Sequence, residues 1–117
     1  MDLLSVSLTI IGGAITILGF AVCFYWYIFW NQNYNGQLLT SGPYRLVRHP
    51  FYSGFLFMAI GLAVAIPIYE TRFLLVITVA VIVVFIPKEE EVLLKKYRGR
   101  YQKYMQEVKY RLIPYIY

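Results

Sequence analysis

The chain has 117 residues, of which 60% are hydrophobic and 19% aromatic, and its mean hydropathy is +0.59. A soluble domain of this size could not bury so much apolar surface, so the composition excludes an ordinary soluble domain and favours the lipid bilayer as solvent. The net charge is +5, and basic residues beside a membrane are explained more simply by anionic lipid head groups than by nucleic acid.

The first predicted element in chain order is an apolar helix over residues 3–30, which is long enough to cross the hydrocarbon of a bilayer with some tilt. It has no basic n-region and no small-residue cleavage site, so we interpret it as an anchor and not as a removed signal peptide. The aromatic residues at 24–30 are typical of a membrane–water interface. Gly12, Gly13 and Gly19 favour the close approach of a second helix.

A polar loop follows over residues 31–48, and a second apolar helix is predicted over residues 50–69. Pro50 suits the first residue of this helix because its missing N–H is not needed there, and Pro67 disturbs the other end. After a tight turn near residues 70–72, a third helix is predicted over residues 72–87, since an open strand edge has no place in lipid. It is short for a full crossing, so either Arg72 snorkels or the helix continues past Pro87.

The last predicted element is an amphipathic helix over residues 88–108. Apolar and aromatic side chains recur there at steps of three and four residues, and cationic and polar side chains cover much of the remaining surface. The members of this apolar stripe are Leu93, Tyr97, Tyr101, Tyr104 and Val108. The pattern predicts a helix that lies against the membrane or over a site beside it.

Every Lys and Arg except Arg72 falls on one side of the membrane if the chain crosses three times. By the positive-inside rule that side is cytoplasmic, so the N-terminus is expected outside and the C-terminus inside. The predicted fold class is an all-α integral membrane protein with three transmembrane helices and a cytoplasmic amphipathic C-terminal helix. Residues 1–117 are predicted to form a single membrane domain that contacts membrane lipids and no nucleic acid.

Two polar clusters are predicted on the cytoplasmic face. Residues 42–54 read Gly-Pro-Tyr-Arg-Leu-Val-Arg-His-Pro-Phe-Tyr-Ser-Gly and hold the only histidine, and Lys88 with three following glutamates comes after the third apolar segment. The hairpin of the second and third helices brings the two clusters to one surface, and ionisable groups at membrane depth mark a site by default. Plainer interpretations stay open: the arginines could only obey the positive-inside rule, and the glutamates could only complement a helix dipole. The single histidine argues against a metal site.

Residues 37–114 resemble the isoprenylcysteine carboxyl methyltransferase family, with its phospholipid N-methyltransferase relatives. The resembling pieces are Leu-Thr-Ser-Gly-Pro-Tyr at 39–44, Arg-His-Pro-Phe-Tyr-Ser-Gly at 48–54, and Glu89-Glu90 after one hydrophobic hairpin. The apolar stripe of the last helix and Pro114 then follow in the family's order and spacing.

The resemblance implies methyl transfer from S-adenosylmethionine to a lipophilic acceptor, such as a prenylcysteine carboxylate or a phospholipid amine, at the cytoplasmic membrane face. Lys88 and Phe85 are the expected substrate-binding residues, and the catalytic residues stay unknown. The expected cofactor-binding residues are Gln37, Leu38, Leu39, Tyr44, Arg48, His49, Pro50, Phe51, Tyr52, Glu89 and Glu90. An aromatic ring could face the sulfonium of the cofactor, the helix start at Pro50 with Arg48 could meet its carboxylate, and Glu89 could accept from its amino group.

Three departures from the family's pattern keep other interpretations open. Arg98 stands where the family usually has glycine, and Phe85 stands where the prenylcysteine enzymes commonly carry an arginine. Residues 110–117 resemble the ending of membrane sterol reductases. A reductase that uses NADPH and a non-catalytic membrane subunit are therefore the alternatives. Because the chain is short, a second copy could complete the acceptor site, which leaves a homo-oligomer open.

Overall fold

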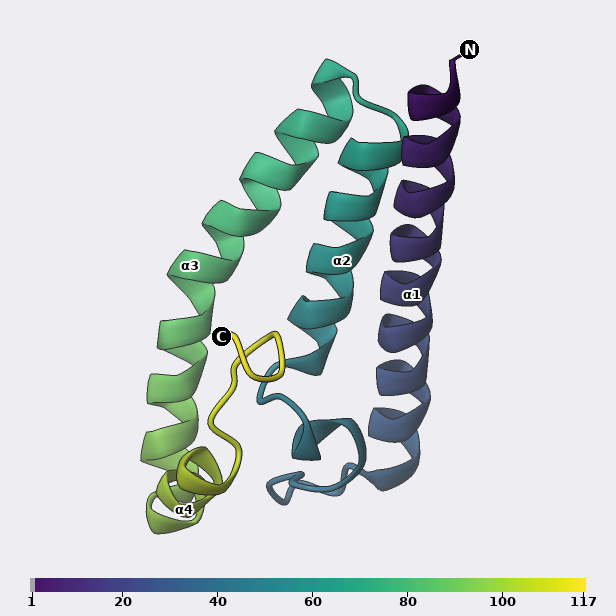
Figure 1. Ribbon diagram of the computed structural model, residues 1–117. Helices are drawn as coiled ribbons and strands as arrows, with labels where there is room; N and C mark the ends of the chain where they lie inside the picture. Colours follow the sequence, from purple (N-terminus) through teal and green to yellow (C-terminus); the bar gives the residue numbers. More distant parts are fainter. Residues whose placement is uncertain (1) are drawn as a thin grey trace.

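The computed structural model describes residues 2–117, which form four α-helices and one short 3-10 helix (Figure 1). The bounds are α1 (Leu3–Asn33), η1 (Gly42–Arg45), α2 (Pro50–Ala65), α3 (Tyr69–Tyr97) and α4 (Gly99–Glu107). The prediction of an all-helical fold is confirmed for this part of the chain. Of the helices in this part of the chain, α1 and α3 are long and apolar enough to cross a membrane, and α2 is a shorter apolar helix.

α1 and α2 pack against each other along a seam of glycines. A Cβ added at Gly12 or Gly19 of α1 would come within 3.0 Å of backbone atoms of α2, and a Cβ at Gly54 or Gly61 of α2 would meet the backbone of α1 in the same way. Gly13 faces open space instead, so two of the three glycines predicted to favour a close approach take part in it. The seam lets the two backbones touch, and packing at that distance is a main source of helix association in lipid.

The connection between α2 and α3 lies earlier than predicted. α2 ends at Ala65, three residues including Pro67 form the link, and α3 begins at Tyr69. Residues 70–72 therefore lie in the first turn of α3 and not in a turn between helices, which corrects the predicted bounds of 50–69 and 72–87. The cause is local: Pro67 has no N–H with which to continue α2. In addition, Thr71 Oγ1 accepts a hydrogen bond from the Ile68 amide at 3.3 Å, which caps the new helix.

α3 also continues through Pro87 to Tyr97, so the predicted break at residues 87–88 is wrong. The alternative that the helix continues past Pro87 is the one observed. A proline inside a helix costs about 3 kcal/mol, and buried side chains on either side of it offset this cost. Ile86 is 1% exposed and Glu90 is 4% exposed, and each makes tertiary contacts that the helical phase has to satisfy.

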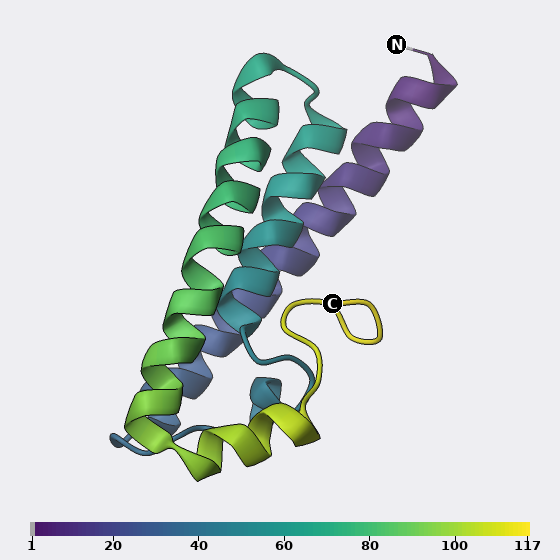
Figure 2. The ribbon, with the colours of Figure 1, turned by 90° about the vertical axis from the view of Figure 1, so that its left-hand side faces the viewer.

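α2 lies between α1 and α3 in Figure 1. The C-terminal ends of α1 and α3 extend well beyond the start of α2. The loop that contains η1 contacts α4 near this end of α2, where the Tyr104 hydroxyl donates to the Tyr44 carbonyl at 2.7 Å. Figure 2 shows the tail turning back from α4 toward the start of α2. The Arg48 amide donates to the Tyr110 carbonyl at 2.9 Å and the His49 amide donates to the Arg111 carbonyl at 3.0 Å, so the tail pairs with the segment that enters α2.

The predicted apolar stripe is a packed cluster, but it comes from two helices and not one. Tyr101 and Tyr104 of α4 are buried together with Val108, and Leu93 and Tyr97 of α3 pack against them. The predicted helix over residues 88–108 is therefore replaced by the last turns of α3 and by α4, with a sharp change of direction at Arg98. This residue has φ +51° and ψ −120°, a backbone conformation that favours glycine.

Replacing Arg98 by glycine is expected to stabilise the fold by about 1 kcal/mol, because a non-glycine residue held at positive φ stores about 1–3 kcal/mol of strain and the greater freedom of glycine in the unfolded chain removes part of the gain. The midpoint of thermal unfolding in detergent, followed by circular dichroism, measures the effect. The matched control is Gln102→Gly in the exposed interior of α4, which should lower the midpoint because glycine is the poorer helix former. A lower midpoint for Arg98→Gly would contradict the strain argument.

Candidate functional site

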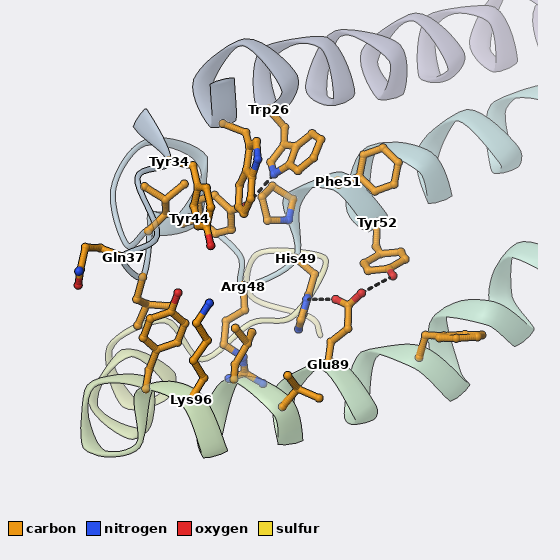
Figure 3. Close-up of a pocket in the computed structure, with 18 of the residues that line it drawn as sticks. Trp26, Tyr34, Gln37, Tyr44, Arg48, His49, Phe51, Tyr52, Glu89 and Lys96 are labelled. Atoms are coloured by element: carbon orange, nitrogen blue, oxygen red, sulfur yellow. Dashed lines mark hydrogen bonds and ion pairs between the residues drawn. The ribbon is translucent and has the colours of Figure 1, made fainter. Parts of the chain in front are cut away.

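A cavity of about 760 Å³ lies where α2 begins (Figure 3). Its walls come from the end of α1, from the loop before α2, from the first turn of α2 and from one face of α3. The volume lies within the range of about 300–1,000 Å³ that small-molecule sites occupy. The lining residues are Trp26, Trp30, Tyr34, Gln37, Leu38, Leu39, Tyr44, Arg48, His49, Pro50, Phe51, Tyr52, Phe85, Lys88, Glu89, Val92, Leu93, Lys96 and Tyr97.

The structure brings all but one of the predicted site residues into this lining. Residues 37–39, Tyr44, residues 48–52, Phe85, Lys88 and Glu89 line the cavity together, although they are far apart in sequence. The α3 members stand at positions i, i+3, i+4, i+7, i+8, i+11 and i+12 from Phe85, which is the spacing of one helix face, so this face of α3 forms one wall of the cavity. The exception among the predicted residues is Glu90.

Sequence reasoning missed the contribution of α1. Trp26, Trp30 and Tyr34 line the cavity at steps of four residues, and Trp30 stacks on Tyr34 with ring centroids 4.1 Å apart. The spacing could have marked them as one helix face, but aromatic residues at the end of an apolar helix are also typical of a membrane interface, which is how we interpreted them. Val92, Leu93, Lys96 and Tyr97 were missed as lining residues as well.

A small polar group stands among these aromatic walls. The Tyr52 hydroxyl donates to Glu89 Oε1 at 2.7 Å, and Glu89 Oε2 lies 3.9 Å from His49 Nδ1 (Figure 3). The Glu89 side chain is 47% exposed, so its carboxylate keeps free acceptor positions toward the cavity. A ligand with an amino group or hydroxyls would find a charged acceptor here.

Glu90 points away from the cavity and, unlike the other predicted cofactor-binding residues, does not line it. Its Oε2 accepts from Arg48 Nε at 2.8 Å and from His49 Nε2 at 3.1 Å, and its Oε1 lies 2.9 Å from Arg111 Nη2. Glu89 and Glu90 are successive residues of α3 and point about 100° apart, and Glu90 lies outside the face of α3 that lines the cavity. Glu89 faces the cavity. Glu90 instead connects Arg48 and His49, just before α2, to Arg111 of the C-terminal tail.

Arg48 lines the cavity with part of its side chain, but its charged group is engaged elsewhere. Besides the bond to Glu90, Nη1 donates to the carbonyls of Val108 at 3.2 Å and Lys109 at 3.5 Å. Arg48 is 9% exposed. We had expected this guanidinium to meet the carboxylate of the cofactor. In the structure its donors are bonded to Glu90 and to two backbone carbonyls, so it stabilises the fold.

The start of α2 offers a different partner for such a carboxylate. Pro50 is the first residue of the helix, and the cap residue His49 makes no side-chain bond to the helix start. The amides of Phe51 and Tyr52 lie in the first turn, where a helix provides no backbone acceptor. Pro50, Phe51 and Tyr52 all line the cavity, so the positive end of the helix dipole lies at its wall.

Tyr44 connects the loop to the aromatic wall. Its hydroxyl accepts a hydrogen bond from Trp26 Nε1 at 2.7 Å (Figure 3). Its carbonyl accepts a hydrogen bond from the Tyr104 hydroxyl of α4 at 2.7 Å. Burial raises the pKa of the Tyr44 phenol, so the ring stays neutral and its faces stay available to a cation. No group of three or more His, Cys, Asp or Glu that could hold a metal ion occurs among residues 2–117.

The chain is similar to several known proteins. It matches the family model described as phospholipid methyltransferase over residues 2–100. It is 39% identical over 87 residues to the Delta(14)-sterol reductase TM7SF2 of Mus musculus, a match that covers 69% of this chain and 20% of the reductase. It is 41% identical over 78 residues to the probable protein-S-isoprenylcysteine O-methyltransferases of Oryza sativa subsp. indica and subsp. japonica, which covers 62% of this chain and 38% of each. The matched region is thus well under half of each of these relatives. No solved structure matches the chain significantly.

Proposed function

The chain belongs to the phospholipid methyltransferase family, as its resemblance to the isoprenylcysteine and phospholipid methyltransferases predicts, and on this premise we propose that it transfers a methyl group from S-adenosylmethionine to a lipophilic acceptor at a membrane face. One observation carries the proposal: aromatic rings, the partly exposed carboxylate of Glu89 and the N-terminus of α2 all line the same cavity. A cofactor that holds a sulfonium, an amino acid group and a nucleoside needs these three kinds of partner.

The described residues fit the groups of this cofactor. Glu89 would accept from its amino group or ribose hydroxyls, and the first-turn amides of Phe51 and Tyr52 would receive its carboxylate. Tyr44 and Tyr52 offer ring faces to the sulfonium, and Gln37, Leu38 and Leu39 lie at the end of the cavity that the loop provides. S-adenosylmethionine, when bound, supplies a methyl group attached to a positively charged sulfur.

The chain itself would act by positioning and by exclusion of water. An in-line displacement needs its two reactants held in line, and no dedicated acid or base pair is required when the acceptor arrives in its nucleophilic form. The aromatic rings of α1 would keep water from one side of the cavity, and the hydrogen bond from Tyr52 holds Glu89 in place at 2.7 Å. Phe85 and Lys88 on the face of α3 would meet the acceptor.

We place the protein in a membrane with α1, α2 and α3 as three transmembrane helices. The N-terminus would lie outside, and α4 and the cavity at the cytoplasmic face, because every Lys and Arg except Arg72 then lies on the cytoplasmic side. A prenylcysteine carboxylate and a phospholipid amine are both candidate acceptors, and a second copy of the chain could complete the acceptor site. The similarity to a sterol reductase supports a second candidate, an enzyme that binds NADPH, but it covers only 20% of that reductase.

Replacing Glu89 by glutamine should weaken the binding of S-adenosylhomocysteine by about tenfold, because a charged acceptor is exchanged for a neutral one of the same shape. Tyr52→Phe should weaken it by less, since it removes only the hydroxyl that orients Glu89. Calorimetric titration of the detergent-purified protein measures both affinities. The matched control is Glu91→Gln two residues further on, whose carboxylate pairs with Lys95 on the exposed face. Unchanged affinity in Glu89→Gln, with the fold intact, would return the glutamates to the helix-dipole interpretation.

A further inference from the structure

His49 is the only histidine of the chain, and its ring stands between two carboxylates at the cavity wall. Its Nε2 lies 3.1 Å from Glu90 Oε2, on the side that does not face the cavity. Its Nδ1 lies 3.9 Å from Oε2 of Glu89, which does line the cavity (Figure 3). The ring therefore connects a buried carboxylate to one that a ligand can reach.

The contact with Glu90 determines which ring nitrogen carries the proton. The guanidinium groups of Arg48 and Arg111 both bind Glu90, and opposite charges at this distance favour the ionised carboxylate. An ionised carboxylate only accepts hydrogen bonds, so His49 Nε2 has to be the donor. In the neutral ring the other nitrogen, Nδ1, then keeps a lone pair on the side of Glu89.

The gap between His49 Nδ1 and Glu89 Oε2 suits an ammonium group. A hydrogen bond between nitrogen and oxygen is about 2.9 Å long, so 3.9 Å is too long for a direct bond. One donor atom can nevertheless lie within bonding distance of both acceptors. An ammonium nitrogen has several N–H bonds and can donate to both, whereas a hydroxyl has a single hydrogen and satisfies only one of them.

From this geometry we propose that His49 is a catalytic base, which takes a proton from an acceptor that arrives as an ammonium ion between its Nδ1 and Glu89. The inference rests on the proposed function and deepens it, because it gives a residue of the cavity wall a chemical role. An alkylamine is protonated at neutral pH and has no lone pair with which to attack. An imidazole that a buried carboxylate holds in one tautomer is an arrangement that activates nucleophiles in enzymes of several folds.

The proton transfer prepares the bond changes of the methyl transfer. One N–H bond of the ammonium breaks, and its proton moves to His49 Nδ1 while Nε2 keeps its own proton on Glu90. The amine nitrogen then forms a bond to the methyl carbon, and the bond from that carbon to sulfur breaks with its electron pair left on sulfur. The positive charge passes from sulfur to the methylated nitrogen. His49 returns its proton to solvent when the product leaves.

The surroundings of His49 can accommodate the charge that it gains. Two carboxylates lie beside the ring, and the two guanidinium groups that bind Glu90 balance them. The uncharged hydroxyls of Tyr52 and Tyr101 lie against the same carboxylates, at 2.7 Å from Glu89 and 3.5 Å from Glu90. These groups come from α2, α3, α4, the loop before α2 and the tail. A proton on Nδ1 gains Glu89 as a partner without disturbing the bond to Glu90.

Because His49 is the only histidine, NMR of the protein labelled with nitrogen-15 histidine observes a single imidazole. The protein would be purified in detergent through a tag that contains no histidine. Near neutral pH we expect Nε2 to be protonated and Nδ1 unprotonated. Dihexanoyl phosphatidylethanolamine should shift the Nδ1 signal, whereas dihexanoyl phosphatidylcholine, whose ammonium has no N–H, should leave it in place.

Three results of this titration would overturn the proposal. The first is a free protein with its proton on Nδ1 and none on Nε2. The second is an equal shift with both lipids, because the N–H donors would then play no part. The third is a shift with S-adenosylhomocysteine but none with phosphatidylethanolamine, because the amino group of the cofactor would then occupy the gap.

His49→Gln tests the base by transfer of labelled methyl groups, since its amide N–H can still reach Glu90 but it has no basic nitrogen. Transfer to dihexanoyl phosphatidylethanolamine near neutral pH should fall by about a hundredfold or more. It should recover by about tenfold per pH unit as the pH approaches the pKa of an alkylamine, about 10, because free amine then forms in solution. The wild type should gain much less over that range.

A variant that does not recover with pH would overturn the role of His49 as a base, and so would wild-type transfer to N-acetyl-S-farnesylcysteine without transfer to the amine. Circular dichroism checks the fold of the variant, and the wild-type NMR titration decides the question if the variant does not fold. Binding of S-adenosylhomocysteine without an effect of the amine on Nδ1 would leave the methyltransferase and remove the base. The reverse result would support the ammonium site and remove the proposed cofactor.

Discussion

Glu90→Ala is expected to destabilise the protein by about 3–5 kcal/mol, the cost of leaving a buried charge without its partner. Glu90 is 4% exposed and holds Arg48 at 2.8 Å, His49 at 3.1 Å and Arg111 at 2.9 Å. Removing its carboxylate leaves the guanidinium of Arg48, itself 9% exposed, without a counter-charge in the interior. The midpoint of thermal unfolding in detergent should fall by about 10 °C or more.

Glu91→Ala is the control for this experiment, because it removes a neighbouring carboxylate whose ion pair with Lys95 lies in solvent. Exposed pairs of that kind contribute little, so its midpoint should stay close to that of the wild type. Glu90→Gln should fall between the two, since the amide oxygen can still accept a hydrogen bond but supplies no charge. Equal midpoints for Glu90→Ala and Glu91→Ala would mean that the Glu90 cluster does not hold the tail and α2 together.

Gly19→Leu is expected to separate α1 from α2. Even a Cβ at this position would lie within 3.0 Å of the Gly54 carbonyl oxygen and the Met58 amide nitrogen, and backbone atoms inside a helix cannot move aside. Overpacking costs about 1–3 kcal/mol where side chains can adjust, so we expect a loss at or above the upper end of that range. The variant should also bind ligands in the cavity more weakly, because Trp26 and Trp30 line the cavity from α1 and would move with that helix.

Gly13→Leu is the matched control, on the same helix and with the same change in volume. A Cβ at Gly13 meets nothing within 4 Å, so this variant should be as stable as the wild type or slightly more so, since leucine is the better helix former. Thermal midpoints and the affinity for S-adenosylhomocysteine would be measured for both variants. A similar loss in both would show that α1 tolerates no bulk at all, and the seam would then not be the cause.

Much of the fold follows from local patterns in the chain. Apolar segments of sufficient length predict helices wherever lipid is the solvent, and Pro50 predicts the start of α2 because its missing N–H is harmless only in the first turn. Pro87 carried the same kind of local signal and gave the wrong bound. There the burial of Ile86 and Glu90 outweighs the local preference, and such long-range contacts do not appear in a local pattern.

For the candidate site, the sequence predicts which segments come together but not which way each side chain points. Joining two helices by a short connection brings their far ends to one surface, which is why His49 and Glu89 could be expected near each other. Which of two adjacent glutamates faces the cavity depends on the rotation of α3, and that is set by the partners of Glu90 and not by local sequence. The part played by Trp26 and Trp30 depends on the glycine seam, which sets how closely the end of α1 approaches the start of α2.

The measurement that tests the central claim most directly is a calorimetric titration of the detergent-purified protein with S-adenosylhomocysteine, with NADPH in a parallel titration. We predict saturable binding of S-adenosylhomocysteine at one site per chain and no binding of NADPH. Binding of NADPH alone would contradict the methyltransferase assignment of the cavity and favour the reductase. Binding of neither, by a folded protein, would contradict both enzymes and favour a non-catalytic membrane subunit.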